Sequence, residues 1–406
     1  MDREDFRTLL SPLGQQLLAR IGEATGGALD ADIDPLPLAT RLRRDYPPSL
    51  VAVALTQFRL RARARERFGA DAAHMYFTTD GLEQATRSSV AIHRAARYRA
   101  LRDKSPGTLH TIDLCCGIGG DLIALARAGC LVNGVDRDGL TVDVARANID
   151  ALGLSDHAAV HQGDVETIDA ATVAAYDAAY CDPSRRAGHG RIFDPAAYAP
   201  PLGQAAELVR SVAGGGLKVA PGIPHDAVPA EAEAEWVSDG GEVKEAALWL
   251  GGLSSGTARR ATLLPSGATL VRDPDLGDPP VAPPQRYLYE PDGAVLRAGL
   301  VAEVAAAVDG ALVDPTIAYV TSERRTSTPY TKMYEITDVL PFSLKRLRAL
   351  LRQRRVGTVT IKKRGSAVDV ERLRRDLRLS GPYSATIILT RVAGAPYALL
   401  CAPLPS

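Results

Sequence analysis

Apolar residues recur at three- and four-residue spacing through about the first hundred positions of the chain. There is little of the alternation with β-branched residues that is typical of strands, so the spacing predicts helices at 6–25, 51–68 and 79–102. The two prolines in Tyr46–Ser49 predict a break in front of the second of these helices. We therefore expect an N-terminal helical domain over residues 1–105.

Beyond this region the pattern changes to short apolar runs that alternate with amphipathic stretches of helical length. The predicted strands are 109–114, 131–135, 158–161, 178–181 and 217–220, with closing strands at 246–250 and 261–264. This order is typical of β-α-β units, so we expect an α/β fold over residues 106–271, with a doubly wound Rossmann-like sheet. The proline-rich stretch 272–284 predicts a linker.

Residues 285–406 predict a third, α+β domain. Its expected helices are 299–308, 343–355 and 369–377, and its expected strands are 358–363, 385–392 and 397–401.

Composition places the chain among ordinary soluble proteins, with 46% hydrophobic and 24% charged residues. The acidic N-terminus has no apolar run behind it, and no run of 18 apolar residues occurs, so we expect neither a secretory signal nor a membrane span. Five cysteines without zinc-finger spacing predict reduced thiols, no metal site and a cytoplasmic location.

The formal net charge of zero conceals an asymmetry. Segment 324–378 holds sixteen Lys/Arg and five Asp/Glu, an excess of eleven that the remaining chain must balance. Such a separation of charge indicates an anionic partner rather than a particular fold.

The most specific motif, Ile112–Asp121, joins a strand to a helix start through a glycine-rich turn. Gly117, Gly119 and Gly120 permit a sharp turn and the close approach of a ligand, because a Cβ atom there would collide. A dinucleotide fold would need the spacing G-x-G-x-x-G, whereas this turn has G-x-G-G and an acid, Asp113, at the strand end. That acid would repel a diphosphate but suits the amino end of a methionine moiety.

Acids also follow the next two strands. A carboxylate at Asp136 can accept hydrogen bonds from both hydroxyls of a ribose. Asp164 can accept one from an adenine amino group, with Val165 beside the ring. Asp138 and Asp121 each have two interpretations, either as a ligand-binding acid or as the cap of the helix that follows.

With these acids at the ends of three successive strands, segment 109–186 resembles the class I S-adenosylmethionine-dependent methyltransferases. The resemblance implies that S-adenosyl-L-methionine is the cofactor and that Asp113, Asp136 and Asp164 hold its methionine, ribose and adenine parts. The candidate cofactor-binding residues are Asp113, Cys115, Gly117, Gly119, Gly120, Asp121, Asp136, Arg137, Asp164, Val165 and Asp182. The alternative is that the acids cap helices and turns in a doubly wound fold of another purpose.

The fourth strand ends in Asp182-Pro183-Ser184-Arg185, where this family places the groups that meet the methyl acceptor. The loop resembles the D/N-P-P-Y/F/W motif of amino-directed methyltransferases and the D-P-P-R motif of RNA methyltransferases, although Ser184 replaces the second proline. An exocyclic amine is a poor nucleophile because its lone pair is delocalised, and a hydrogen bond to Asp182 would favour the attacking geometry. We expect Asp182, Pro183, Ser184 and Arg185 to form the catalytic loop.

Other residues near this loop have two interpretations each. Arg185 and Arg186 suit a phosphate or a stacked base, or else ion pairs with neighbouring acids. Cys181 could act as a nucleophile, but its place inside the strand favours a buried thiol. No aromatic residue follows Pro183, so a stacking partner must come from elsewhere, with the candidates Tyr180, Phe193 and Tyr198.

The C-terminal segment from residue 337 to 402 combines Leu340-Pro341-Phe342 with a basic helix, a basic strand and a second basic helix. Together with the core before it, this segment resembles the THUMP-like domain of bacterial methyltransferases. The resemblance implies binding of structured RNA, in which a basic surface gains affinity by releasing counterions. The alternative is a solvated charged face. The candidate RNA-binding residues are Arg186, Lys345, Arg348, Arg352, Lys362, Lys363 and Arg364.

The expected function is therefore methylation of a base in structured RNA such as tRNA or rRNA, with an exocyclic amine favoured. One alternative is a small-molecule methyltransferase whose C-terminal part serves folding or dimerisation. Another is a non-catalytic RNA-binding protein that retains the cofactor pocket, although the intact Asp182-Pro183 loop argues against it.

Overall fold

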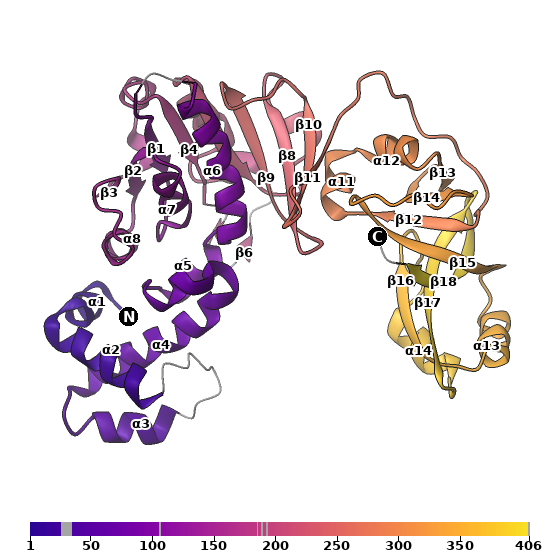
Figure 1. Ribbon diagram of the computed structural model, residues 1–406, viewed down its shortest axis with the longest axis horizontal. Coiled ribbons are helices and arrows are strands. Elements are labelled where there is room, and N and C mark those ends of the chain that lie inside the picture. Colours follow the sequence, from indigo (N-terminus) through magenta and orange to yellow (C-terminus); the bar gives the residue numbers. More distant parts are fainter. Residues whose placement is uncertain (26–34, 105–106, 185, 188–189, 192–193, 405–406) are drawn as a thin grey trace. The chain divides into compact units, whose positions relative to one another are not determined.

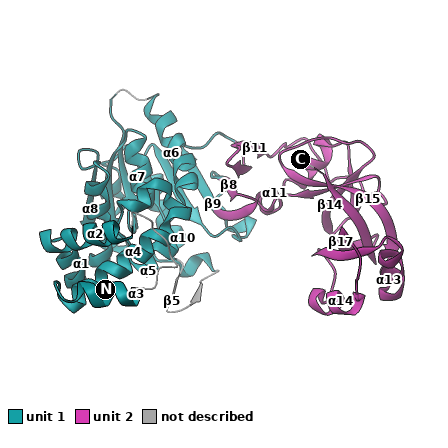
Figure 2. Ribbon diagram, turned by 60° about the horizontal axis from the view of Figure 1, so that its bottom comes forward, with its two compact units in different colours: residues 1–233, 246–256 teal, residues 234–245, 257–406 magenta. Residues whose placement is uncertain are grey.

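The computed structural model describes residues 1–25, 35–104, 107–184, 186–187, 190–191 and 194–404. Contacts divide the chain into two compact units, which Figure 2 distinguishes by colour. Unit 1 comprises Met1–Glu233 and Ala246–Gly256, and unit 2 comprises Ala234–Glu245 and Thr257–Ser406. This division crosses the expected boundary after residue 271, because the strands between 257 and 271 belong to unit 2. The three-domain division therefore stays a prediction.

The N-terminal part of unit 1 is helical, as predicted (Figure 1). Two expected helices are each split in two. Ser11 caps a new helix that begins at Pro12, and Ala85 has an extended backbone that ends another helix. The helices are α1 (Arg3–Leu10), α2 (Pro12–Ala24), α3 (Pro35–Leu42), α4 (Pro48–Phe68), α5 (Thr79–Gln84) and α6 (Ser88–Arg102).

The predicted parallel strands lie side by side at one end of a nine-stranded sheet. Strands β3, β2, β1, β4 and β7 run parallel in that order, and β9 pairs antiparallel with β7. Their bounds are β1 (His110–Leu114), β2 (Leu131–Asp136), β3 (Ala158–Gln162), β4 (Ala178–Cys181), β7 (Gly214–Val219) and β9 (Glu242–Gly251). This order confirms the doubly wound, Rossmann-like fold.

Helices cover this sheet and complete its core. Helix α7 (Gly120–Arg127) contacts β2, α8 (Gly139–Ala151) contacts β2 and β3, and α10 (Leu202–Arg210) contacts β4 and β7. Every residue of β4 and β7 is buried. The short elements between them are η2 (Val165–Thr167), α9 (Ala170–Val173), β5 (Arg186–Ala187), β6 (Gly190–Arg191), η3 (Pro195–Ala197) and η4 (His225–Ala227), and η1 (Gly69–Ala73) follows α4.

Three further strands extend the order of the nine-stranded sheet beyond β9: β8 (Glu233–Asp239), β10 (Arg259–Leu264) and β11 (Ala268–Val271). The predicted strands at 246–250 and 261–264 are confirmed as parts of β9 and β10, whereas β8 and β11 were not expected. Residues 272–284 contain no helix or strand, and in unit 2 they connect β11 to the next strand.

A second, seven-stranded sheet forms the rest of unit 2, in the order β13-β14-β12-β15-β18-β17-β16. Its strands are β12 (Tyr287–Pro291), β13 (Ala311–Asp314), β14 (Ile317–Ser322), β15 (Thr331–Pro341), β16 (Val356–Lys363), β17 (Tyr383–Val392) and β18 (Ala395–Leu404). Its helices are α11 (Gly293–Ala298), α12 (Val301–Ala307), α13 (Leu344–Gln353) and α14 (Val370–Leu377). Helices α13 and α14 bury Leu347 and Leu373 against Ile387 of β17, which explains the apolar spacing of these otherwise basic helices.

Candidate active site

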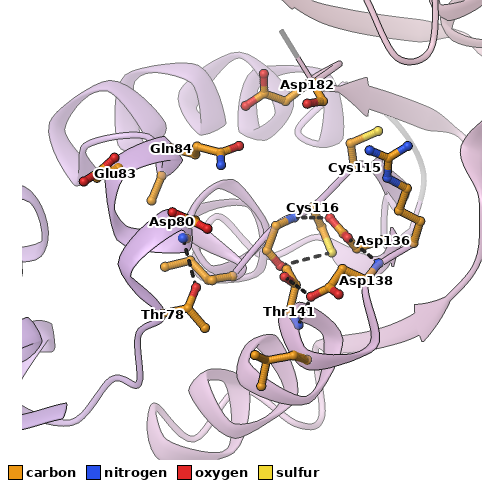
Figure 3. Close-up of a pocket in the computed structure, with 18 of the residues that line it drawn as sticks. Thr78, Asp80, Glu83, Gln84, Cys115, Cys116, Asp136, Asp138, Thr141 and Asp182 are labelled. Atoms are coloured by element: carbon orange, nitrogen blue, oxygen red, sulfur yellow. Dashed lines mark hydrogen bonds between the residues drawn. The ribbon is translucent and has the colours of Figure 1, made fainter. Parts of the chain in front are cut away.

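A cavity of about 1100 Å³ lies in unit 1 at the carboxyl ends of the central strands, and Figure 3 shows it in close-up. Residues of α4 and α5 contribute to its lining as well as the strand ends. Two lining residues, Arg137 and Lys218, have basic side chains. The acidic lining residues are Asp80, Glu83, Asp113, Asp121, Asp136, Asp138, Asp164, Glu166 and Asp182.

The glycine-rich turn after β1 adopts the conformation that its sequence indicated. Gly117 and Gly119 have φ angles of 56° and 89°, a region that side chains with a Cβ atom rarely adopt. Cys115 also has a positive φ, of 67°. Gly117, Gly120 and Cys115 line the cavity, while Gly119 serves the turn as the N-cap of α7.

Asp136 at the end of β2 is joined to the glycine turn by a hydrogen bond. The amide of Gly117 donates to its Oδ2 at 3.0 Å, and the amide of Asp138 donates to its Oδ1 at 3.0 Å. Burial raises the pKa of Asp136. Asp138 is itself the N-cap of α8, because it accepts from the amide of Thr141 at 2.8 Å. The cap interpretation of Asp138 is thus confirmed, and Asp136 is the acid that joins the two loops.

Asp113 at the end of β1 is fully buried, and neither carboxylate oxygen accepts a hydrogen bond from the described residues. Burial, and secondly the negative charge of Asp182, raise the pKa of Asp113 to about 8. A buried carboxyl group without a partner is costly to the free protein. A cationic ligand beside it would remove much of that cost.

Asp164 and Val165 follow β3 and line the same cavity. Asp164 caps a short 3-10 helix, since the amide of Glu166 donates to its Oδ1 at 3.0 Å. Val165 is buried. Asp164 therefore both caps this helix and lines the cavity. Its role as a cap does not exclude a hydrogen bond to an adenine amino group.

Asp121 is neither a helix cap nor a carboxylate without partners. It is buried at the start of α7, where Arg94 of α6 donates to one oxygen and Thr86 donates to the other at 2.8 Å. Gly119 is the N-cap of α7 and makes no side-chain cap. Asp121 therefore forms an internal ion pair at the edge of the cavity, and its role as a cofactor ligand stays a prediction.

Asp182, Pro183 and Ser184 line the cavity beside the end of β4. Lys218 of β7 donates to Oδ2 of Asp182 at 2.6 Å. Ser184 is held by two backbone hydrogen bonds with Ala199, at 2.8 and 3.0 Å. Arg185 lies outside the described residues, as does the stacking candidate Phe193, and the side chain of Arg186 is not described.

The remaining candidates near this loop are buried. Tyr180 and Tyr198 are 0% and 2% exposed and lie outside the lining, so neither stands at the cavity as a stacking partner. A hydrogen bond with Cys115, together with burial, raises the pKa of the Cys181 thiol well above its ordinary value. The thiol therefore stays protonated at neutral pH, which favours the buried-thiol interpretation.

In unit 2 the candidate RNA-binding residues fall into two groups. Lys345 and Arg352 on α13 are exposed. The others have partners within unit 2: Arg348 donates to the carbonyl of Asp376, Lys362 pairs with Glu290, Lys363 donates to the carbonyl of Val368, and Arg364 donates to the carbonyl of Ala318.

Sequence reasoning missed Lys218, Arg94 and Thr86. A single lysine within the apolar strand that it predicted at 217–220 was the available signal, since a buried ammonium group needs a counter-charge. Among the residues that the structure describes, no cluster suitable for a metal ion occurs, and no helix is long and apolar enough to cross a bilayer.

Three protein-family profiles match the chain. They are a THUMP domain-like family at residues 331–403, a domain of unknown function at 2–64, and the RNA cap guanine-N2 methyltransferases at 109–188.

Two relatives, from Mycobacterium tuberculosis strains CDC 1551 and H37Rv, are named as S-adenosylmethionine-dependent methyltransferases. Each is 36% identical over 362 residues, which cover 86% of this chain and 94% of the relative. A crystal structure from Porphyromonas gingivalis W83 has the same fold, with a TM-score of 0.76 at 23% identity over 96% of this chain and 99% of that one.

Proposed function

Because this chain belongs to the S-adenosylmethionine-dependent methyltransferases, we propose that it methylates an exocyclic amine of a base in structured RNA, such as tRNA or rRNA. The observation that carries the proposal is the carboxylate of Asp182, which lies in the same cavity as Asp113 and Asp136. Figure 3 shows Asp182 and Asp136 in this cavity. Its side chain is 23% exposed, so an acceptor can reach it.

The residues of the cavity fit the cofactor, which supplies an electrophilic methyl group when bound. The carboxyl group of Asp113, buried and without a partner, suits the ammonium of the methionine part. Asp136 suits the ribose hydroxyls, and Asp164 with Val165 suits the adenine. Arg137 and Cys115 complete this side of the cavity.

Asp182 acts on the acceptor. Its carboxylate accepts a hydrogen bond from the amine N–H, which orients the nitrogen, and then takes the proton that the nitrogen loses on methylation. Pro183 limits the motion of the loop. Gln84 and Asp80 of α5 also point into the cavity (Figure 3), so α5 is suited to form part of the acceptor side.

RNA is supported as the partner by the family profiles at 109–188 and 331–403. It is also supported by a basic surface on α13 and α14, which we define by its exposed residues Lys345, Arg346, Arg352, Arg372, Arg374 and Arg375. These side chains can approach phosphates without leaving an ion pair in the protein interior.

A small amine is the second candidate, and the charge of the cavity favours it. Acidic residues outnumber Arg137 and Lys218 in the lining, so the phosphate groups of an RNA substrate would have to remain outside while one base enters. A neutral or cationic small molecule meets no such requirement.

The test is transfer of labelled methyl groups to RNA from cells that lack the protein, followed by mass spectrometry of the nucleosides. We expect one methylated nucleoside that is absent from the cellular RNA before the reaction. Asp182→Asn should lower the rate by roughly 100-fold without weakening cofactor binding. The opposite result is RNA that contains, before the reaction, every methylated nucleoside that is found after it. If a small amine then accepts the labelled methyl group, the small amine replaces RNA as the proposed acceptor.

A further inference from the structure

Lys218 is a buried cation at the edge of the acceptor side of the cavity. It lies on β7, is 5% exposed, and has two hydrogen-bond partners from distant parts of unit 1. Its Nζ donates to Oδ2 of Asp182 at 2.6 Å and to Oγ1 of Thr86 at 2.9 Å.

Thr86 continues this interaction into the interior. Its hydroxyl donates to Oδ2 of Asp121 at 2.8 Å, and Arg94 donates to the other oxygen of Asp121. The guanidinium of Arg94 in turn lies 4.5 Å from the ring centre of Tyr180. A continuous chain of polar contacts therefore runs from the reaction loop to the buried face of α6.

This chain determines which part of Asp182 is available. Lys218 engages Oδ2, so Oδ1 is the oxygen that faces no described donor. The ammonium also offsets negative charge, because the carboxyl group of Asp113 lies close enough to those of Asp182 and Asp136 to interact with both. A methionine of similar length would fill the space without the cost of burying a charge, so packing alone does not call for lysine here.

We propose that Lys218 is the positioning residue of Asp182, holding its carboxylate oriented with one oxygen free for the acceptor amine. This inference rests on the proposed function, in which Asp182 contacts the acceptor. Thr86, which accepts from Lys218 and donates to Asp121, holds the ammonium in place.

Calorimetric titration with S-adenosylhomocysteine between pH 6 and pH 9 tests the charge arrangement without any acceptor. The groups that act on Asp113 are Asp182 and Asp136, which raise its pKa, and Arg94 and Lys218, which lower it. If binding needs ionised Asp113, Lys218→Met should move the pH midpoint of binding upward and Asp182→Asn should move it downward. The double variant should return it towards the wild-type value, because the opposing charges are then both absent.

Turnover on the RNA that the wild-type protein methylates forms the second readout. Lys218→Met should lower kcat, measured at saturating cofactor, by about 100-fold, and adding Asp182→Asn to it should cause little further loss. Thr86→Val should lower kcat in the same direction, while Thr86→Ser, which keeps the hydroxyl, should not. Lys244→Met is the matched control, since Lys244 pairs with Glu242 in unit 2 and does not line the cavity.

Several outcomes would overturn the positioning role. One is a pH midpoint of binding that moves in the same direction in Lys218→Met and Asp182→Asn. Another is a loss of kcat in the double variant that equals the product of the two single losses. The third is a Lys244→Met variant whose effects equal those of Lys218→Met. Failure of the proposed function looks different: the wild-type protein methylates no RNA while the opposed pH shifts of the two single variants remain.

Discussion

The carboxyl group of Asp113 is buried where β1 meets the cavity, and it accepts no hydrogen bond from the described residues. Folding therefore removes it from water without replacing the lost interactions, which accounts for the pKa of about 8. A residue kept at such a cost is expected at a site that binds a cation. In the proposed cofactor site, stability and cofactor binding would oppose one another at Asp113.

Replacing Asp113 by Asn should stabilise the free protein and weaken cofactor binding. The folded protein holds the proton of Asp113 up to about pH 8, whereas the unfolded chain releases it near 3.8, so Asp113 makes stability fall as pH rises between these values. In thermal unfolding without cofactor, Asp113→Asn should raise Tm more at pH 8 than at pH 5, by about 2–4 °C per kcal/mol. The exposed Asp156→Asn is the control. An unchanged or lower Tm at pH 8 would remove the argument for a destabilising carboxyl group.

Two neighbouring acids allow the ribose role to be separated from local structure. Asp136 faces the glycine turn, while Asp138 caps α8, although only two residues separate them. Asp136→Ala should weaken binding of S-adenosylmethionine by ~1.5–3 kcal/mol, the scale of hydrogen bonds to a charged acceptor. Asp138→Ala should instead lower stability by ~1 kcal/mol through loss of the cap, with a smaller effect on affinity. Calorimetry and thermal unfolding of both variants measure the two effects, and wild-type affinity in Asp136→Ala would exclude Asp136 from the ribose site.

At the scale of elements, the sequence predicted what depends on local signals. The ends of β1, β2 and β4 follow from apolar runs that stop at an acid, and the glycine turn follows from its residues. Strand β8 was missed because Glu233 and Glu235 interrupt its apolar pattern. Glu233 is buried with partners distant in sequence, Arg97 at 2.7 Å and the amide of Ser255 at 2.6 Å. The partners of Lys218 could not be predicted either, since they come from residues distant in sequence.

The contact between α5 and the glycine turn depends on the absence of a side chain at Gly81. A Cβ atom there would lie 2.5 Å from Cγ2 of Ile118 and 2.7 Å from Oγ1 of Thr78, the residue that caps α5. Gly81→Ala should therefore displace Ile118, lower stability by ~1–3 kcal/mol and weaken cofactor binding. Gly22→Ala on α2 is the matched control, because a Cβ atom there meets nothing within 4 Å. Equal thermal stability and affinity in the two variants would show that α5 does not constrain the turn.

At the scale of the whole molecule, the positive charge of segment 324–378 serves two purposes. Part of it is internal to unit 2: Lys362 pairs with Glu290, and Arg364 donates to the carbonyl of Ala318 and lies over the ring of Tyr319. Another part is solvent-exposed, and it includes Lys345, Arg346 and Arg352 on α13 and Arg372, Arg374 and Arg375 on α14. The excess of eleven positive charges in the sequence is therefore larger than the number of positive side chains that an external partner can contact. The sequence could not indicate the internal partners of Lys362 and Arg364, because Glu290 and Ala318 lie far from them along the chain.

Two double variants distinguish these purposes. If Lys345 and Arg352 contact RNA phosphates, replacing both by Ala should weaken binding of all structured RNAs about equally. It should also flatten the dependence of log affinity on log salt by about 0.7–0.9 units per lost contact. Lys362→Ala with Arg364→Ala should instead lower Tm, because Glu290 loses its ion pair, and should leave the salt slope of the folded protein unchanged. Cofactor affinity should not change in either variant, since the cavity lies in unit 1. A flattened slope confined to the second variant would place the RNA contacts on β16, and no change in either would favour the small amine as acceptor.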